Sequence, residues 1–331
     1  MPKVSVVLPV FNAAGTVARA VRSILEQTVR DIELIVVDDG STDDTADVVK
    51  AIRDPRLRLV QQPRGQVAAA ANTGTAHATA PLIARMDADD YSHPQRLERQ
   101  CELLQRQSAD VIGCQVRIVD EAGGATCTMQ NYQRWINEET LAAEQIRALR
   151  FVEFPLVNPT IMAGREYFEL GFRDGDFPED YDLMLRAAGQ GMRFAKVDQV
   201  LLDWTDGPYR LTRSDPRYTP EAFDRCRRTH LLSGPLAGAK AVDLWGIGQT
   251  GKPWLRWLQE QGLTVRRGYE LNRRKIGTKI HGVPVAHPDD MPNADGTPLI
   301  IAVRADGARA MITPHVQSRQ YQIGGDAWFV A

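Results

Sequence analysis

Residues 82–90 read Leu-Ile-Ala-Arg-Met-Asp-Ala-Asp-Asp, a short apolar run that ends in a group of acids. The apolar part is predicted to be a buried strand, which places Asp87, Asp89 and Asp90 directly after its carboxyl end. Ligands of open α/β sheets bind beyond the carboxyl ends of the strands. Paired hard carboxylates at that position suit Mg²⁺ or Mn²⁺ bound to a diphosphate. The structural alternative is an acidic turn that caps the helix predicted to begin near Pro94.

From its first residue to this acidic group, the chain alternates strand and helix patterns. The predicted strands are Val4–Val10, Ile32–Val37, Leu57–Val60 and Leu82–Met86. They are rich in β-branched and apolar residues, as parallel strands covered on both faces are. Amphipathic helix patterns lie between them. This order predicts an α/β fold built on an open, mostly parallel sheet with right-handed crossovers.

The length of the chain predicts more than one domain. A chain of 331 residues is too long for one small core and suggests two domains. The stretch Ser233-Gly234-Pro235-Leu236-Ala237-Gly238 is rich in residues that break regular structure. We therefore expect a first domain at residues 1–232, a linker at 233–239 and a second domain at 240–331.

The second domain begins with a pattern typical of nucleotide-binding βαβ units. A predicted strand at 241–245 precedes Gly246-Ile247-Gly248-Gln249-Thr250-Gly251 and a helix, and Glu270 ends the next strand. This loop pattern with a later acid is found in dinucleotide-binding folds. Gly246, Gly248, Gly251 and Glu270 are therefore candidate nucleotide-binding residues of a small Rossmann-like domain. The sequence also allows a domain that only packs or assembles.

Charge and composition exclude some classes of function. The net charge is −2, with basic and acidic residues interleaved, so nothing indicates nonspecific binding to nucleic acid. No apolar stretch reaches the ~18–20 residues of a membrane span, and the N-terminus lacks the pattern of a signal peptide. We expect a cytoplasmic protein. Peripheral contact with a membrane-bound acceptor and a homo-oligomeric state stay open.

The cysteine pattern agrees with a reducing compartment. The four cysteines are widely spaced and form no C-x-x-C pair: Cys101, Cys114, Cys127 and Cys226. Such spacing fits free thiols better than a zinc site or disulfides.

A second acidic pair, Glu179-Asp180, opens a helical stretch whose apolar positions include Leu183, Met184 and Ala187. A carboxylate beside a bound substrate can act as a general base. Acids at a helix N-terminus also stabilise the helix dipole, which is the structural alternative for this pair.

Several motifs resemble those of family 2 glycosyltransferases. They occur in the family's order and are VSVVLPVFN (4–12), SILEQT (23–28), VDDGSTD (37–43), MDADD (86–90) and FPEDYDLMLR (177–186). The resemblance covers residues 1–232. It implies a GT-A fold, a sugar-nucleotide donor, inversion at the anomeric carbon, and Mg²⁺ or Mn²⁺ as cofactor.

The resemblance also implies roles for single residues. For the donor, Pro9, Val10 and Phe11 would line the nucleobase pocket, Asp39 would hydrogen-bond the base, Arg85 would contact the diphosphate or sugar, and Asp87 would contact the ribose or sugar. For the chemistry, Asp89 would ligate the metal and Asp180 would be the catalytic base, with Glu179 as the second candidate. The family often carries a late histidine near the metal, whereas this chain has Trp204 and Arg210–Arg213 in that region.

The expected function is an inverting, metal-dependent transfer of a sugar to an acceptor hydroxyl, in the synthesis of surface polysaccharide or glycoconjugate. The donor would be a UDP-, dTDP- or GDP-linked sugar, and the acceptor a saccharide or a lipid-linked molecule. One alternative is a catalytically inactive protein that binds sugar nucleotides or serves as a scaffold. A nicotinamide oxidoreductase built on the second domain is a third hypothesis.

Overall fold

The computed structural model describes residues 2–106, 109–120, 122–124, 129–207 and 210–331, so Cys127 lies outside the described residues. The chain divides into two compact units. The first contains Met1–Ile146 and Pro155–Cys226, and the second contains Arg147–Phe154 and Arg227–Ala331. This division falls inside helix α10 (Pro220–Ser233). The linker at 233–239 stays a prediction.

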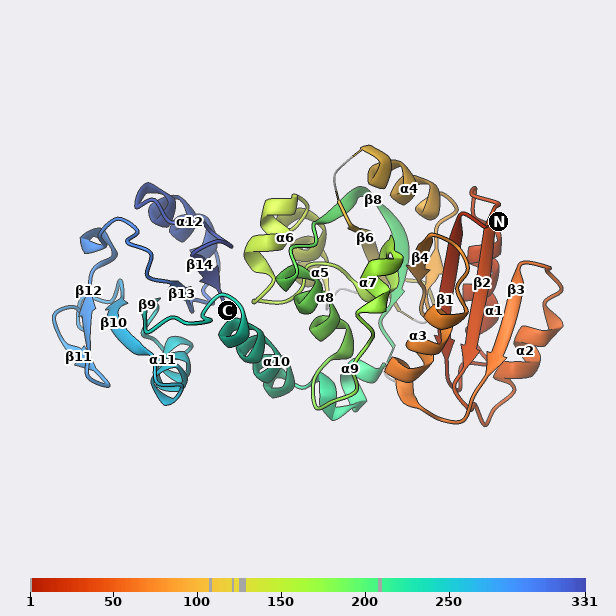
Figure 1. The fold of residues 1–331 in the computed structure, drawn as a ribbon, viewed down its shortest axis with the longest axis horizontal. Coiled ribbons are helices and arrows are strands. Elements are labelled where there is room, and N and C mark those ends of the chain that lie inside the picture. Colours follow the sequence, from red (N-terminus) through yellow and green to blue (C-terminus); the bar gives the residue numbers. More distant parts are fainter. Residues whose placement is uncertain (1, 107–108, 121, 125–128, 208–209) are drawn as a thin grey trace. The chain divides into compact units, whose positions relative to one another are not determined.

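The first unit is built on one eight-stranded sheet. Its strands are β1 (Val4–Val10), β2 (Ile32–Asp38), β3 (Leu57–Gln61), β4 (Leu82–Arg85), β5 (Tyr91–Ser92), β6 (Val111–Val119), β7 (Met162–Gly164) and β8 (Phe194–Thr205). They are ordered β3-β2-β1-β4-β7-β6-β8-β5. The first four positions are parallel, β7 runs antiparallel between β4 and β6, and β6 is parallel to β8. The predicted α/β fold with a mostly parallel sheet is therefore confirmed (Figure 1).

Helices connect these strands and cover the sheet. The helices of the first unit are α1 (Val17–Leu25), α2 (Thr45–Ala51), α3 (Gln66–His77), α4 (Arg96–Arg106), α5 (Gln130–Arg134), a π-helical turn (Trp135–Glu139), α6 (Ala143–Leu149), α7 (Arg165–Glu169), α8 (Glu179–Gly189), α9 (Leu211–Ser214) and 3₁₀ turns at Asn158–Thr160 and Pro216–Tyr218. The end of α6, from Arg147 to Leu149, belongs to the second unit.

Close packing explains why α3 is rich in small residues. A Cβ atom at Gly74 would lie only 2.3 Å from Cγ1 of Val7 in β1, so only glycine lets the helix approach the sheet this closely. On the other face of β1, Val6 and Leu8 join a core that includes Val21 and Ile24 of α1. Strand β1 is thus buried on both faces, as its apolar sequence predicts.

The second unit has a six-stranded sheet. Its elements are β9 (Ala241–Trp245), α11 (Gly251–Glu260), β10 (Thr264–Tyr269), β11 (Lys279–Ile280), β12 (Val283–Ala286), a 3₁₀ turn (Pro288–Asp290), β13 (Leu299–Ile301), α12 (Ala308–Ser318) and β14 (Ala327–Phe329). The strand order is β11-β12-β10-β9-β13-β14, and only β11 is antiparallel to its neighbour. The strand–loop–helix order is the expected one, and a Rossmann-like assignment stays a prediction.

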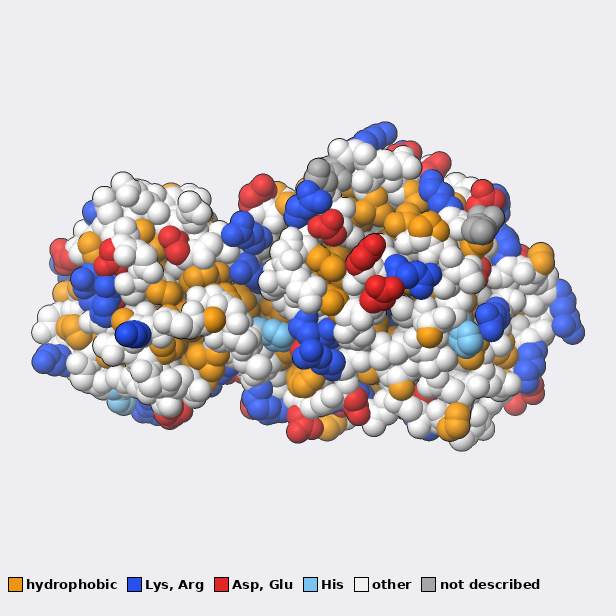
Figure 2. Space-filling model, viewed as in Figure 1, with side chains coloured by type: hydrophobic (Ala, Val, Ile, Leu, Met, Phe, Trp, Pro, Cys, Tyr) orange, Lys and Arg blue, Asp and Glu red, His pale blue; other side chains and the backbone are white. Residues whose placement is uncertain are grey.

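The mixed charges on the surface and the free cysteines agree with what the composition indicates. On the face shown in Figure 2, basic and acidic side chains are interspersed. Cys101 and Cys114 are buried free thiols. Among the described residues, none of the helices is both long and apolar enough to cross a membrane.

Candidate active site

Gln27, in the motif at residues 23–28, forms hydrogen bonds with the segment that follows the acidic turn Asp87–Asp90. The side-chain Nε2 of Gln27 donates to the carbonyls of Ser92 (3.4 Å) and His93 (2.8 Å), and its side-chain oxygen accepts from the backbone N–H of Leu97 (3.1 Å). These bonds join the chain just after α1 to β5 and to the start of α4. Because β5 and α4 follow the turn directly, this part of the sequence fixes where the turn leaves the sheet.

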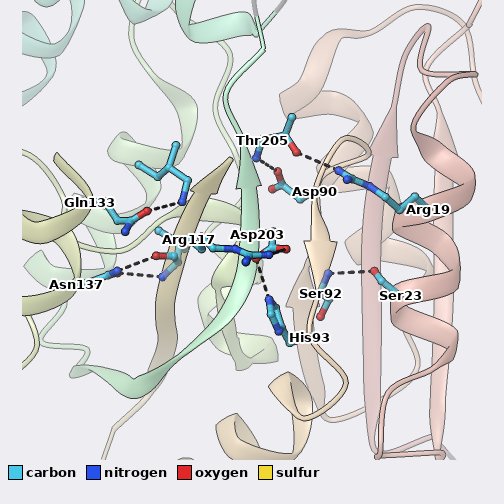
Figure 3. A network of polar contacts seen from close by, with 12 residues as sticks. Arg19, Ser23, Asp90, Ser92, His93, Arg117, Gln133, Asn137, Asp203 and Thr205 are labelled. Atoms are coloured by element: carbon cyan, nitrogen blue, oxygen red, sulfur yellow. Dashed lines mark hydrogen bonds and ion pairs between the residues drawn. The ribbon is translucent and has the colours of Figure 1, made fainter. Parts of the chain in front are cut away.

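Two donors from outside the turn, Arg19 and Thr205, hold its backbone; Figure 3 shows both residues and the bond from Thr205 to Asp90. The Arg19 guanidinium, from α1, donates to the Asp89 carbonyl at 2.6 Å, and the Thr205 hydroxyl donates to the same carbonyl at 2.6 Å. The Thr205 amide donates to Oδ1 of Asp90 at 2.9 Å. The turn is therefore tied to a helix and to the end of β8.

The carboxylates of the turn repel one another. Burial, and then the charge of Asp87, raise the pKa of Asp89 to about 6. Burial, and then the charges of Asp89 and Asp87, raise the pKa of Asp90 well above its usual range. Oδ2 of Asp90 is buried and has no hydrogen-bond partner among the described residues. Crowded, hard oxygen ligands of this kind fit a divalent cation such as Mg²⁺ or Mn²⁺, whose charge would relieve the repulsion.

The second acidic pair opens α8. Glu179 is 3% exposed and accepts a hydrogen bond from the Tyr218 hydroxyl at 2.7 Å. Burial raises the pKa of Glu179, and the bond from Tyr218 opposes that rise. Burial, and then the charge of Glu179, raise the pKa of Asp180 to about 7. Its Oδ1 accepts a local bond from the Tyr181 amide at 2.7 Å. Asp180 therefore titrates near neutral pH, whereas Glu179 is engaged by Tyr218.

The two acidic clusters lie within electrostatic reach of each other. The charge of Asp87 adds to the rise in the pKa of Asp180, and the charge of Arg85 lowers the pKa of Glu179. Arg85 is 1% exposed and donates to Oδ1 of Asp87 at 3.3 Å. The fold thus brings together residues that are about 90 positions apart in the sequence.

The residues predicted to bind the nucleobase gather at the carboxyl ends of β1 and β2. The Asp39 amide donates to the Val10 carbonyl at 2.9 Å, so the loops that follow β1 and β2 begin side by side. Phe11 is 39% exposed, and the Arg64 guanidinium lies 3.4 Å from its ring centroid.

The Asp39 carboxylate already has several partners. It is 1% exposed and accepts from Arg64 (2.7 Å), the Gln62 side chain (2.7 Å) and the Gly65 amide (2.8 Å). The sequence pattern does not reveal Arg64, because its partners become neighbours only through the pairing of β2 with β3. The predicted contact between Asp39 and a base stays a prediction.

The late segment, in which the family often carries a histidine, contains Trp204 and Arg210. The Arg210 guanidinium stacks 4.1 Å from the ring centroid of Trp204 and pairs with Asp206 at 3.6 Å. Its charge opposes the rise in the pKa of Asp89, so it lies near the acidic turn. Arg213 is 49% exposed and also pairs with Asp206, at 2.7 Å.

In the second unit, the glycine-rich loop is a tight turn. Gly246 has φ +98°, and a Cβ atom at Gly251 would lie 1.6 Å from the Gly246 carbonyl oxygen, so both positions require glycine. The Lys275 ammonium donates to the Ile247 carbonyl at 3.1 Å and to Glu270 at 2.8 Å. A nucleotide role for this loop, including Gly248, and for Glu270 stays a prediction.

The fold and the site define an α/β protein with a cluster of buried acids beyond the carboxyl ends of its strands. The chain belongs to glycosyl transferase family 2, whose pattern residues 5–171 match. It is 34% identical over 209 residues to the succinoglycan biosynthesis protein ExoU of Rhizobium meliloti, covering 58% of this chain and 58% of that protein. The chain spans about half the length of the curated relatives it matches.

Two solved structures share the fold. The TarS fragment from S. aureus in complex with UDP-GlcNAc has a TM-score of 0.56 at 20% identity, over 70% of this chain and 67% of that one. The mannosyltransferase PcManGT from Pyrobaculum calidifontis, in complex with GDP-Man and Mn²⁺, has a TM-score of 0.52 at 20% identity, over 78% and 80%. These likenesses support the GT-A fold.

Proposed function

We propose that this protein transfers a sugar from a nucleoside diphosphate to an acceptor hydroxyl, with inversion at the anomeric carbon. The observation that carries the proposal is Asp180, a buried carboxyl group with a pKa of about 7 that lies within electrostatic reach of Asp87. A general base works best when its pKa is near the working pH. The second pKa-shifted acid, Glu179, is held by Tyr218, which favours Asp180 as the base.

The proposed reaction is a single displacement. The acceptor oxygen forms a bond to the anomeric carbon while the bond to the diphosphate oxygen breaks, and the diphosphate leaves with the electron pair. The acceptor's proton passes to a carboxylate oxygen of Asp180. Arg85, which contacts Asp87, would orient the sugar or diphosphate. The hydrogen bond from Arg19 to the Asp89 carbonyl would keep Asp89 in position.

The proposed cofactor is Mg²⁺ or Mn²⁺, held by Asp89. Its chemistry would be to neutralise negative charge on the departing diphosphate. The crowded, acidic turn supports this, as does the Mn²⁺ bound in PcManGT. The neighbours bind UDP-GlcNAc and GDP-Man respectively, so UDP-, dTDP- and GDP-sugars are all proposed as donors. The similarity to a succinoglycan biosynthesis protein supports a saccharide or lipid-linked acceptor in polysaccharide synthesis.

The test measures release of nucleoside diphosphate from a panel of UDP-, dTDP- and GDP-linked sugars, with and without Mn²⁺ and with water as the acceptor. We expect turnover with one class of donor. Asp180→Asn should abolish it while nucleotide binding, followed as a rise in melting temperature, remains. Asp110→Asn is a matched control, because Asp110 pairs with Arg193 at an exposed position.

The outcomes separate the hypotheses. Wild-type turnover in Asp180→Asn would show that another group is the base. Nucleotide binding without turnover for any donor would favour the inactive, sugar-nucleotide-binding alternative.

A further inference from the structure

We propose that Arg19 and Thr205 are positioning residues that fix the acidic turn in the geometry needed to bind a divalent cation. The inference rests on the proposed function, because it concerns the metal ligand Asp89. Neither residue is acidic, and neither lies in a sequence motif that carries the family resemblance.

Both residues act on the backbone of the turn. The carbonyl oxygen of Asp89 accepts two hydrogen bonds, from Arg19 Nη2 and from the Thr205 hydroxyl, each at 2.6 Å. Arg19 Nη2 also donates to the Thr205 hydroxyl oxygen at 3.1 Å, so Arg19, Thr205 and the Asp89 carbonyl are each hydrogen-bonded to the other two. A carbonyl with two lone pairs is fully used by two donors. The peptide plane after Asp89 is therefore held from both α1 and β8.

The next residue is tied to the same point. Oδ1 of Asp90 accepts from the Thr205 amide at 2.9 Å, and Asp90 is 1% exposed. Thr205 thus contacts two consecutive residues of the turn, one through its hydroxyl and one through its amide. With the peptide between Asp89 and Asp90 fixed, the direction in which the Asp89 side chain leaves the backbone is set by residues from outside the turn.

This arrangement has the form of an outer support for a metal ligand. Groups that orient a ligand without touching the metal commonly change metal affinity when they are replaced. The need for support is clear from the charges, because Asp87, Asp89 and Asp90 repel one another and would otherwise move apart. The bonds from Arg19 and Thr205 to the Asp89 carbonyl resist that movement through the main chain and do not use the Asp89 carboxylate.

The same network contains a matched control (Figure 3). Two residues before Thr205 on β8, Asp203 accepts from Arg117 at 2.6 Å and from His93 at 2.9 Å. This cluster joins β8 to β6 and to the residue after β5, and within the described part of the chain it makes no hydrogen bond or ion pair with Asp89 or Asp90. Replacing Arg117 disturbs the same strand without releasing the turn.

The experiment measures Mn²⁺ binding directly by electron paramagnetic resonance of the free ion, on the full chain, with Mn²⁺ alone and with UDP or GDP added. The variants are Thr205→Val, which removes the hydroxyl, Thr205→Ser, which restores it, Arg19→Gln and the control Arg117→Gln. We expect Thr205→Val and Arg19→Gln to weaken Mn²⁺ binding by about tenfold or more. Thr205→Ser and Arg117→Gln should bind as the wild type does. In turnover assays, the KM for Mn²⁺ should rise more than kcat falls.

Two results would overturn the inference. One is Mn²⁺ affinity of folded Thr205→Val or Arg19→Gln within about twofold of the wild type; the other is an equal loss in Arg117→Gln. If Thr205→Val does not fold, judged by circular dichroism, the partly exposed Arg19 carries the test. Wild-type protein that binds no Mn²⁺ with either nucleotide would overturn both this inference and the proposed metal. Wild-type protein that binds Mn²⁺ but never releases nucleoside diphosphate would overturn only the transferase proposal.

Discussion

Replacing the proposed base should stabilise the fold while it abolishes turnover. The carboxyl group of Asp180 is buried beside Glu179, and both effects raise its pKa from 3.8 to about 7. The folded protein therefore favours the neutral acid, and ionisation of Asp180 works against folding. Asp180→Asn keeps the shape and the acceptor for the Tyr181 amide but cannot ionise.

The magnitude follows from the pKa shift. At 1.36 kcal/mol per pKa unit, the ionised group destabilises the folded state by about 4 kcal/mol at and above neutral pH. A buried amide that lacks a full set of partners costs about 1–3 kcal/mol, so the net gain for Asp180→Asn is about 2 kcal/mol. A group whose folded pKa is raised contributes stability below its unfolded pKa and loses it as pH rises through the folded value. The advantage of the variant should therefore grow from pH 4 to pH 7 and then level off.

The assay is calorimetry of the full chain across this pH range, with Asp203→Asn as the control of opposite sign. Burial acts to raise the pKa of Asp203, but hydrogen bonds and charge from His93 and Arg117 outweigh it and lower the pKa. Asp203→Asn should lower the melting temperature at neutral pH, and its deficit should shrink as pH falls through the carboxyl range. Both aspartates lie in the first unit, so the same transition should move in opposite directions. A melting temperature for Asp180→Asn equal to or below that of the wild type at pH 8, with no dependence on pH, would refute the reasoning.

Three further predictions concern activity and packing. The kcat/KM for donor turnover should fall as the pH decreases below about 7, because Asp180 gains its proton. Glu179→Gln should shift this fall in kcat/KM to lower pH, because it removes a charge that raises the pKa of Asp180. An unshifted pH profile would contradict this. Gly74→Ala should destabilise the protein by about 1–3 kcal/mol through overpacking, whereas Gly189→Ala, with nothing within 4 Å of the new Cβ, should change the melting temperature little. Gly251→Ala should destabilise the second unit, because its Cβ would lie 1.6 Å from a backbone carbonyl oxygen, and calorimetry should show a lower melting transition.

The sheet of the first unit was largely predictable because its central strands, such as β1 and β2, are buried on both faces. Runs such as Val4–Val10 and Ile32–Asp38 are mostly apolar, and the helices between them have clear periodicity. The acidic turn was predictable for the same reason, since it follows a strand of this kind. Prediction was weaker where apolar runs are short. The segment at 158–164 forms a 3₁₀ turn followed by the short strand β7, Met162–Gly164, because Pro159 fits the start of a 3₁₀ turn and lacks the N–H of a sheet donor.

The partners of the site residues were not predictable from local patterns. Tyr218 reaches Glu179 from 39 positions away, and Arg19 reaches Thr205 from 186 positions away. Such pairs depend on how β8 and the segment after it return to the first helix. Tyr218 lies in a stretch rich in residues that break regular structure, which predicts a loop and says nothing about where the loop packs. A sequence pattern can identify an acid, but its pKa is set by neighbours that only the fold supplies.

The predictions on stability, pH and metal binding have one physical origin. Asp89, Asp90 and Asp180 share one region of the first unit, and each has a raised pKa because burial and neighbouring carboxylates oppose its ionisation. A fold selected only for stability would replace or pair these groups, as it pairs Asp203 with Arg117. Negative charge that the fold leaves unpaired would be stabilised when a positive partner binds. A divalent cation and the positive charge that develops at an anomeric carbon would be such partners. Cation binding should therefore stabilise the wild type more than Asp180→Asn, because the wild type carries one more repelling carboxylate for the cation to relieve. An equal thermal shift of both proteins with Mn²⁺ and nucleoside diphosphate would show that the two acidic clusters are not coupled energetically.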